Sequence, residues 1–125
     1  MYTKNYKIYI NVEGGERVES VKVLLNEIVE LNNDYILTPY NLLENAKLQN
    51  YKYVKYYKKD GYLICEMQFD VFKKDYVFYY YFDKNDKLHK IYKEENGKIE
   101  LYFSREDEIL KKTKELKELL ENNDL

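Results

Sequence analysis

The fold is decided by residues 51–103, which read YKYVKYYKKDGYLICEMQFDVFKKDYVFYYYFDKNDKLHKIYKEENGKIELYF. Runs rich in Tyr, Phe, Val and Ile alternate in this stretch with short groups of Asp, Asn, Gly and Lys, which are typical of tight turns. The pattern predicts five strands, at residues 51–58, 62–71, 76–83, 88–94 and 98–103. Because the connections are too short for a crossover, neighbouring strands are expected to run antiparallel and form a meander.

Helical spacing is found on both sides of these strands. Apolar residues recur every three or four positions from Arg17 to about Asn33, and Thr38-Pro39 predicts the start of a second, shorter helix that ends near Leu48. Ser104 is expected to cap a C-terminal helix. The sequence therefore predicts one α+β domain over residues 1–125, with the helices packed on one face of the sheet. The alternation in residues 6–12 leaves open a sixth, N-terminal strand.

Side-chain parity along the strands predicts which face of the sheet is buried. Alternate residues of a strand point to opposite faces, and the more apolar face is expected to meet the helices. That set is Leu63, Cys65, Met67, Phe69, Val71, Ile99, Leu101 and Phe103. The other face is expected to carry Tyr62, Ile64, Glu66, Gln68, Glu100 and Tyr102. Leu88 and Ile91 have opposite parity, which predicts a bulge or an edge position in the fourth strand.

Composition excludes several classes of function. A net charge of −2 and a pI near 5.6 argue against a general binder of nucleic acid or anionic membrane. Cys65 is the only cysteine, so an internal disulfide is impossible and a reducing compartment is indicated. No apolar run is long enough for a membrane span, and the first ten residues do not resemble a signal peptide, so we expect a cytoplasmic protein. The 16 Tyr, together with abundant Lys, Asn and Ile, are typical of a genome rich in A and T, either bacterial or phage.

Four features of the sequence resemble chemical sites, and each has a better structural explanation. His89 follows a predicted turn without a nucleophile nearby, and Cys65 lies on the predicted core face without a neighbouring base. Gly14-Gly15 matches neither nucleotide-binding glycine pattern. The stretch from Asp83 to Glu94 imitates a calcium loop, but Lys87 and Leu88 stand where a ligand oxygen and a glycine are required. We therefore assign no catalytic residue, cofactor or metal ligand, and expect no enzyme.

The remaining signal is a surface rich in Tyr and Lys. The candidate partner-binding residues are Lys52, Tyr53, Lys55, Tyr57, Tyr62, Glu66, Gln68 and Tyr102. Tyr is favoured at protein interfaces, so the leading hypothesis is a small inhibitor of a macromolecule, either a toxin-immunity protein or a phage-encoded inhibitor of a bacterial defence nuclease. One alternative is a binder of single-stranded nucleic acid that uses Lys and Tyr on the sheet. A second alternative is a small-molecule pocket inside a curved sheet. The aromatic face is equally suited to a homodimer interface, or to simple stabilisation of an exposed sheet by Tyr and Lys pairs.

Overall fold

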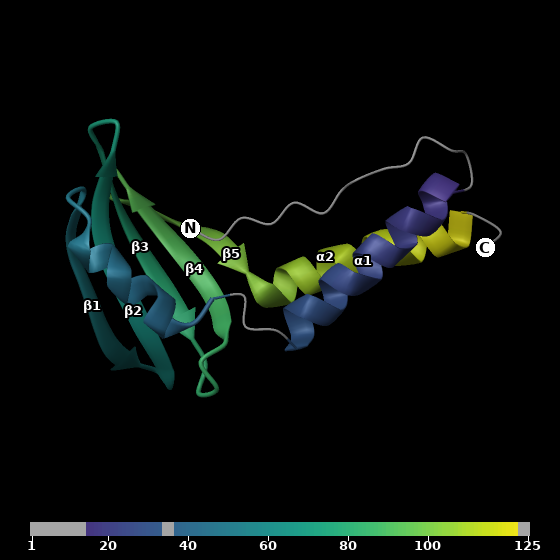
Figure 1. The fold of residues 1–125 in the computed structure, drawn as a ribbon, viewed down its shortest axis with the longest axis horizontal. Coiled ribbons are helices and arrows are strands. Elements are labelled where there is room, and N and C mark those ends of the chain that lie inside the picture. The colour runs from purple at the N-terminus through teal and green to yellow at the C-terminus, as the bar shows by residue number, and fades with distance from the viewer. Residues whose placement is uncertain (1–14, 34–36, 123–125) are drawn as a thin grey trace. The chain divides into compact units, whose positions relative to one another are not determined.

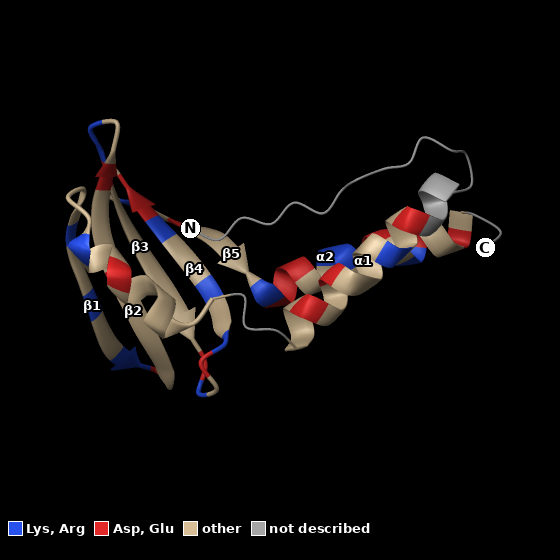
Figure 2. Ribbon diagram, viewed as in Figure 1, with Lys and Arg blue, Asp and Glu red and all other residues tan. Residues whose placement is uncertain are grey.

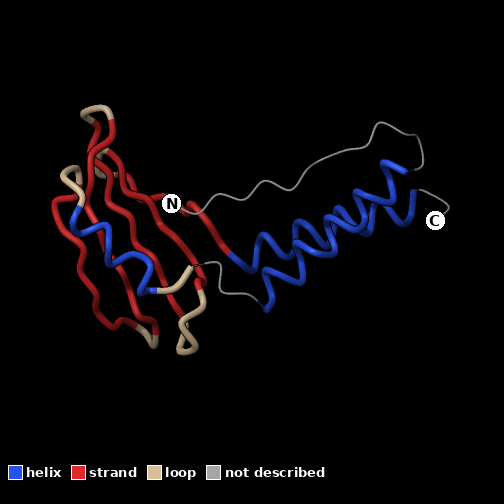
Figure 3. Tube along the Cα trace, viewed as in Figure 1, coloured by secondary structure: helices blue, strands red, loops and turns tan. Residues whose placement is uncertain are grey.

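The structure, a computed structural model, describes residues 15–33 and 37–122, with side chains from residue 19 onward. The chain separates into two compact units, one of residues 1–34 with 106–125 and one of residues 35–105. The second unit contains the sheet, and the first contains a pair of helices (Figures 1 and 3). The predicted strand at residues 6–12 lies outside the described residues.

The sheet unit confirms the predicted α+β fold with a five-stranded antiparallel meander. The strands pair in the order β1-β2-β3-β4-β5, so each strand lies beside its neighbour in sequence (Figure 1). Their bounds are β1 Tyr51–Lys59, β2 Tyr62–Val71, β3 Lys74–Phe82, β4 Leu88–Glu95 and β5 Lys98–Ser104. Among the strands of the described residues, the open order leaves β1 and β5 at the two edges.

Three of the four hairpin turns contain two residues with positive φ, the geometry that matches the twist of paired strands. Asp60-Gly61 has φ of 51° and 83°, and Asn96-Gly97 has 53° and 77°, at the turns that the sequence predicted. The turn between β2 and β3 was predicted at Lys73 to Asp75, but its positive-φ residues are Phe72 (50°) and Lys73 (67°). Large apolar side chains are unusual in turns, so the residue type of Phe72 does not indicate a turn. Phe72 is 97% exposed.

We call the face that holds the hydrophobic core the inner face. Its buried cluster contains Cys65, Met67 and Phe69 from β2, and it continues across β3 and β4 with Phe78, Tyr80, Phe82, Leu88 and Ile91. Cys65 and Phe82 are fully buried. Burial raises the pKa of the Cys65 thiol to about 11, against a weaker lowering by Tyr56. The prediction of a buried structural thiol is therefore confirmed.

A helix over the inner face has tighter geometry than predicted. η1 is a 3₁₀-helix, Pro39–Lys47, and it lies across the β1 side of the sheet (Figure 1). With three residues per turn, Pro39, Leu42 and Asn45 lie on one side. Pro39 and Leu42 are buried, and Asn45 Nδ2 lies 3.7 Å from the sulfur of Met67. Leu43, the next residue around the helix, is 59% exposed.

A bulge in β5 overturns one prediction about the inner face. Ile91 pairs with Phe103, but the next residue, Tyr92, pairs with Leu101, so Tyr102 is an extra residue in the ladder. The extra residue reverses the parity of the rest of β5. Ile99 and Leu101 therefore lie on the opposite face from Phe103, with 58% and 48% of their surface exposed. A second register shift, between Tyr81 and Phe82 in the β3–β4 pair, explains the parity change predicted in the fourth strand.

The other unit contains α1 (Gly15–Asn33) and, from Glu106 onward, α2 (Arg105–Asn122). α1 begins two residues before the predicted start at Arg17, and α2 begins directly after the predicted cap, Ser104. They lie side by side and run in opposite directions (Figure 1). Lys112 of α2 donates a hydrogen bond to Glu27 of α1 at 2.6 Å. The expected packing of these two helices on the sheet, and the single domain, stay predictions. Neither helix, nor any other in the described ranges, combines the length and apolar character needed to cross a membrane.

Candidate functional site

The candidate site is the sheet face opposite η1, which we call the outer face. The strand register brings six tyrosines to this face from four strands, and all six are half-buried. They are Tyr53, Tyr57, Tyr62, Tyr79, Tyr81 and Tyr92. Because the aromatic rings cover each other and the strands between them, even Ile64 on this face is only 1% exposed.

Glu66 is the centre of a hydrogen-bonded cluster on the outer face. The hydroxyl of Tyr53 donates to its Oε2 at 2.7 Å, and the hydroxyl of Tyr57 donates to its Oε1 at 2.8 Å. Lys55 Nζ lies 3.4 Å from Oε2 and 5.3 Å from the centre of the Tyr53 ring. Both carboxylate oxygens therefore have partners, and the side chain of Glu66 is only 13% exposed.

The cluster changes the proton affinities of its members. Burial acts to raise the pKa of Glu66, but the hydrogen bonds from Tyr53 and Tyr57 and the charge of Lys55 outweigh it, so the pKa is lowered. Burial, followed by the bond to Glu66, raises the pKa of each tyrosine to about 12. At neutral pH the carboxylate is therefore charged and both phenols are hydrogen-bond donors.

A second carboxylate holds a tyrosine that sequence reasoning missed. Tyr79 donates to Glu94 Oε1 at 2.7 Å, and burial followed by this carboxylate raises the pKa of Tyr79. Tyr79 pairs with Glu66 on one side and Tyr92 on the other, which extends the cluster from β1 to β4. A turn placed at Phe72-Lys73 would have predicted this register, but the turn signal in the sequence lies one to two residues later.

A line of aromatic rings continues the outer face toward the β3–β4 turn. The ring of His89 stacks on Tyr62 with centroids 5.1 Å apart and planes 10° from parallel. Tyr62 meets the edge of Tyr81 at 5.8 Å, and Tyr81 meets Tyr92 at 5.4 Å. His89 is therefore half-buried in an aromatic contact beside the β3–β4 turn.

The structure brings together seven of the eight candidate partner-binding residues. Gln68 lies on the outer face between Tyr53 and Val77, and Lys52 Nζ reaches Asp75 Oδ1 at 3.3 Å at the rim. Tyr102 is the exception, and its predicted position was wrong. Because it is the bulged residue of β5, its ring lies on the inner side, 5.2 Å from Phe78.

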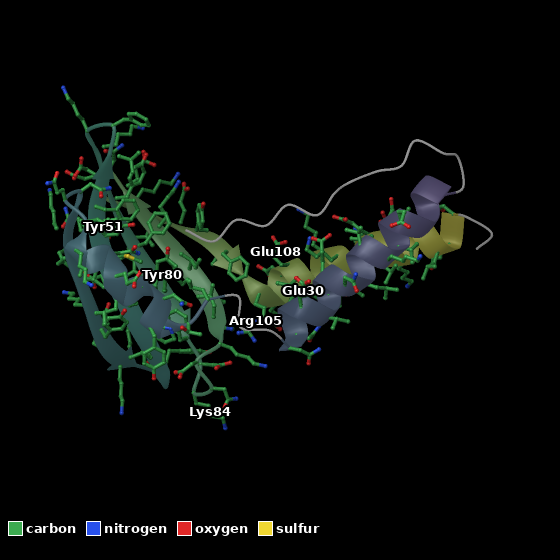
Figure 4. All side chains as sticks on the ribbon, viewed as in Figure 1. Glu30, Tyr51, Tyr80, Lys84, Arg105 and Glu108 are labelled. Carbon is green, nitrogen blue, oxygen red and sulfur yellow. The ribbon has the colours of Figure 1, made fainter. Side chains whose placement is uncertain are left out.

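The turn between β3 and β4, which imitates a calcium loop, uses its first carboxylate for structure. Asp83 Oδ1 accepts backbone N–H groups of Asn85 at 2.9 Å and Lys87 at 3.0 Å. Lys84 projects from the tip of this turn (Figure 4). Next to the turn, the Arg105 guanidinium donates to the carbonyl of Leu88 through Nε at 2.7 Å and also through Nη2. The two bonds to Asp83 give this carboxylate a structural role in the turn.

Two of the hollows in the sheet unit lie beside the β1–β2 hairpin. One of about 550 Å³ separates the β1–β2 turn from the β3–β4 turn, and its lining mixes lysines with aspartates. The other, of about 320 Å³, is apolar and lies between η1 and the β1–β2 hairpin. A small-molecule site usually has a few buried polar groups that orient the ligand. The linings of these two hollows contain no buried polar side chain.

The outer face carries charges of both signs. Its acids are Glu66, Glu94, Asp70 and Asp75, and its lysines are Lys52, Lys55, Lys59 and Lys90. Figure 2 shows that acidic and basic residues both occur in the sheet unit. A surface of this kind offers aromatic rings, fixed hydroxyl groups and balanced charge. It is chemically suited to bind a surface of mixed polarity.

No protein-family model matches the sequence, and neither a curated protein nor a solved structure is similar enough to count as a match.

Proposed function

We propose that this chain is a non-enzymatic binding protein that inhibits a macromolecule by covering it with the outer face of its sheet. The partner class that we propose is a protein, either a toxin countered by its immunity protein or a bacterial defence nuclease countered by a phage inhibitor. One observation carries the proposal: six half-buried tyrosines lie on one sheet face, and Glu66 and Glu94 hold three of their hydroxyls.

Preorganisation supports the use of these tyrosines as anchors. Tyr contributes a large apolar ring and a polar tip to an interface, and it loses little side-chain entropy because it has only two rotatable angles. On the outer face even this freedom is reduced, because Tyr53, Tyr57 and Tyr79 each bond to a carboxylate. A surface that is ordered before binding pays less of the entropic cost of association.

The charge pattern favours a protein over nucleic acid. A face that follows a phosphate backbone is expected to be uniformly basic, because each neutralised phosphate contributes to affinity. Here Lys55 is paired with Glu66 and Lys52 with Asp75. These pairs reduce the positive potential available to phosphates, whereas they suit a partner with charges of both signs.

Affinity capture tests the proposal. The tagged chain is used as bait in a lysate of its own host, with and without nuclease treatment, and the eluate is analysed by mass spectrometry and light scattering. We expect one protein partner in stoichiometric amount that survives nuclease. The partner is then tested for enzymatic activity with and without the chain, and inhibition is expected.

Variants localise the binding to the outer face. Tyr53→Ala combined with Tyr92→Ala removes anchors from β1 and β4, and the expected result is loss of the partner. The matched control is Tyr40→Ala, because Tyr40 is 72% exposed on η1, on the other side of the sheet. Circular dichroism of each variant verifies the fold. Partners that disappear on nuclease treatment, or equal capture by the double variant, would overturn the proposal.

A further inference from the structure

One lysine of the outer face lies between two aromatic rings and opposite a carboxylate. Tyr53, Lys55 and Tyr57 are alternate residues of β1, so their side chains form a row on this face. Glu66 of β2 pairs directly with Lys55. The Nζ atom of Lys55 lies 3.4 Å from Glu66 Oε2, 5.3 Å from the centre of the Tyr53 ring and 6.0 Å from the centre of the Tyr57 ring. All three groups attract a positive charge at this point.

The acidic and aromatic parts of this site are held in place, whereas its lysine is not. The hydroxyls of Tyr53 and Tyr57 bond to the two oxygens of Glu66 at 2.7 and 2.8 Å, and the Glu66 side chain is only 13% exposed. A carboxylate has about four lone pairs, so these two donors leave each oxygen able to accept another. The Lys55 side chain is 58% exposed, and an exposed ion pair contributes little to stability. Another cation can therefore displace Lys55 at low cost.

A second carboxylate strengthens the negative potential at the site. Glu94 accepts the hydroxyl of Tyr79 at 2.7 Å, and Tyr79 pairs with Glu66 in the sheet register. After the larger effect of burial, Glu66 and Glu94 both act to raise the pKa of Tyr53 and the pKa of Tyr79. The fields of the two carboxylates therefore overlap at the centre of the outer face, where Lys55 supplies one positive charge. A further positive charge is attracted to this point.

We propose that Tyr53, Tyr57 and Glu66, which we call the cation site, receive an arginine side chain of the protein partner in place of Lys55. This inference rests on the proposed function and names the group that the outer face recognises. A guanidinium suits the site better than an ammonium group, because it is planar, binds a carboxylate through two N–H groups and stacks on aromatic rings. Arg and Tyr are both enriched among the residues that dominate interface energies, and such residues tend to lie opposite each other.

A small arginine derivative tests the cation site without the partner. N-acetyl-arginine amide is titrated into the isotope-labelled full chain and followed by NMR. We expect saturable shifts of the amide signals of Tyr53, Tyr57 and Glu66. N-acetyl-citrulline amide has nearly the same shape and no charge, so it is expected to cause no saturable shift at these residues.

Variants of two lysines on β1 show whether Lys55 competes for the site. Lys55→Ala should bind the arginine probe about two- to fivefold more tightly than the wild type, because the competing ammonium group is removed. The matched control is Lys58→Ala, which makes the same change in net charge. Lys58 is exposed and lies on the opposite face, where it pairs with Leu63. The affinity of this control for the probe is expected to equal that of the wild type.

Glu66→Gln should abolish saturable binding of the arginine probe, because it keeps the shape of the side chain and removes its charge. Circular dichroism verifies that the variant is folded. Equal binding by Glu66→Gln and wild type, equal binding of the citrulline probe, or no gain in Lys55→Ala would overturn the proposal. Tighter binding of N-acetyl-lysine amide than of the arginine probe would overturn the preference for a guanidinium.

The probe and the affinity capture can fail separately. A captured protein partner together with no binding of the arginine probe would overturn this inference and leave the proposed function standing. Binding of the probe by the cation site, together with no protein partner in the capture, would overturn the proposed function and leave a site for a guanidinium on the outer face.

Discussion

Replacing Glu66 by Gln is the sharpest test of the outer-face cluster, because the change keeps the shape of the side chain and removes its charge. In the wild type two hydroxyls bond to the carboxylate at 2.7 and 2.8 Å, and Lys55 pairs with it at 3.4 Å. Glutamine can still accept from one hydroxyl, and its amide can donate to the other. The variant therefore loses charge assistance while both bonds can persist.

The expected loss at pH 7 follows from these contacts. Hydrogen bonds to a charged partner contribute about 1.5–3 kcal/mol against about 0.5–1.5 kcal/mol for neutral ones. The ion pair with Lys55 adds less than about 1 kcal/mol, because the lysine side chain is 58% exposed. The cluster is partly open to water, so we expect a net loss of about 1–2 kcal/mol, or about 5–10 °C in Tm.

The pH dependence separates this mechanism from a general packing defect. The pKa of Glu66 is lower in the folded chain than in the unfolded chain, where it is about 4.3. Its contribution to stability is therefore complete above the unfolded pKa and is lost as the pH falls through the folded pKa. The difference between wild type and Glu66→Gln should be largest at pH 7 and should shrink below about pH 4.

Urea and thermal denaturation at pH 7, 5.5, 4 and 3.5, followed by circular dichroism, measure this difference. Glu44→Gln is the matched control: Glu44 is exposed on η1, and the expected change is below about 0.5 kcal/mol. Tyr53→Phe and Tyr57→Phe, alone and combined with Glu66→Gln, give the coupling energy of each hydroxyl with the carboxylate. Equal stability of Glu66→Gln and wild type at pH 7, or a difference that does not vary with pH, would refute the reasoning.

Three further predictions concern the fold. Cys65 should not react with a thiol reagent at pH 8 in the native protein, because the thiol is buried and burial raises its pKa to about 11. It should react at once in urea. Rapid reaction of the native protein would contradict its place in the core. Lys112→Ala should destabilise the helix pair by about 2–3 kcal/mol, because it leaves the largely buried Glu27 without its ion-pair partner. Hydrogen exchange of the α1 amides measures this loss. Unchanged exchange would show that the ion pair does not stabilise the helices. Gly97→Ala should lower the free energy of unfolding, measured by urea denaturation, by about 1 kcal/mol. The added methyl group has space, but the φ of 77° is strained for alanine. Unchanged stability would mean that this turn relaxes to another conformation.

Local patterns predicted the elements of this fold well. The turns at Asp60-Gly61 and Asn96-Gly97 were found because their residue types are those that tolerate positive φ. Their short lengths also dictated antiparallel neighbours, so the order of the five strands followed without knowledge of the packing. Cys65 was assigned to the core from parity alone, and it is fully buried.

The register of the strands was harder to predict from the sequence, because a single residue in a turn or a bulge changes which residues pair. Phe72 occupies a positive-φ turn position that its residue type does not announce, so Tyr79 was not expected beside Glu66. The bulge at Tyr102 then reversed the parity of β5 and moved that tyrosine away from the other candidates. Seven of the eight candidate residues nevertheless meet at the outer face and its rim, since parity within β1 and β2 is undisturbed after Tyr53.

The sequence by itself determined that residues 51–103 form a meander of five strands and that Tyr62, Glu66 and Gln68 lie on the face opposite Cys65. Those features depend on residue type at each position and on the period of two along a strand. Only the tertiary structure decided that Glu66 joins two tyrosines from β1, that Glu94 holds Tyr79, and that η1 turns with a period of three. Such contacts join atoms distant in sequence, and their partners are selected by register, bulges and packing together.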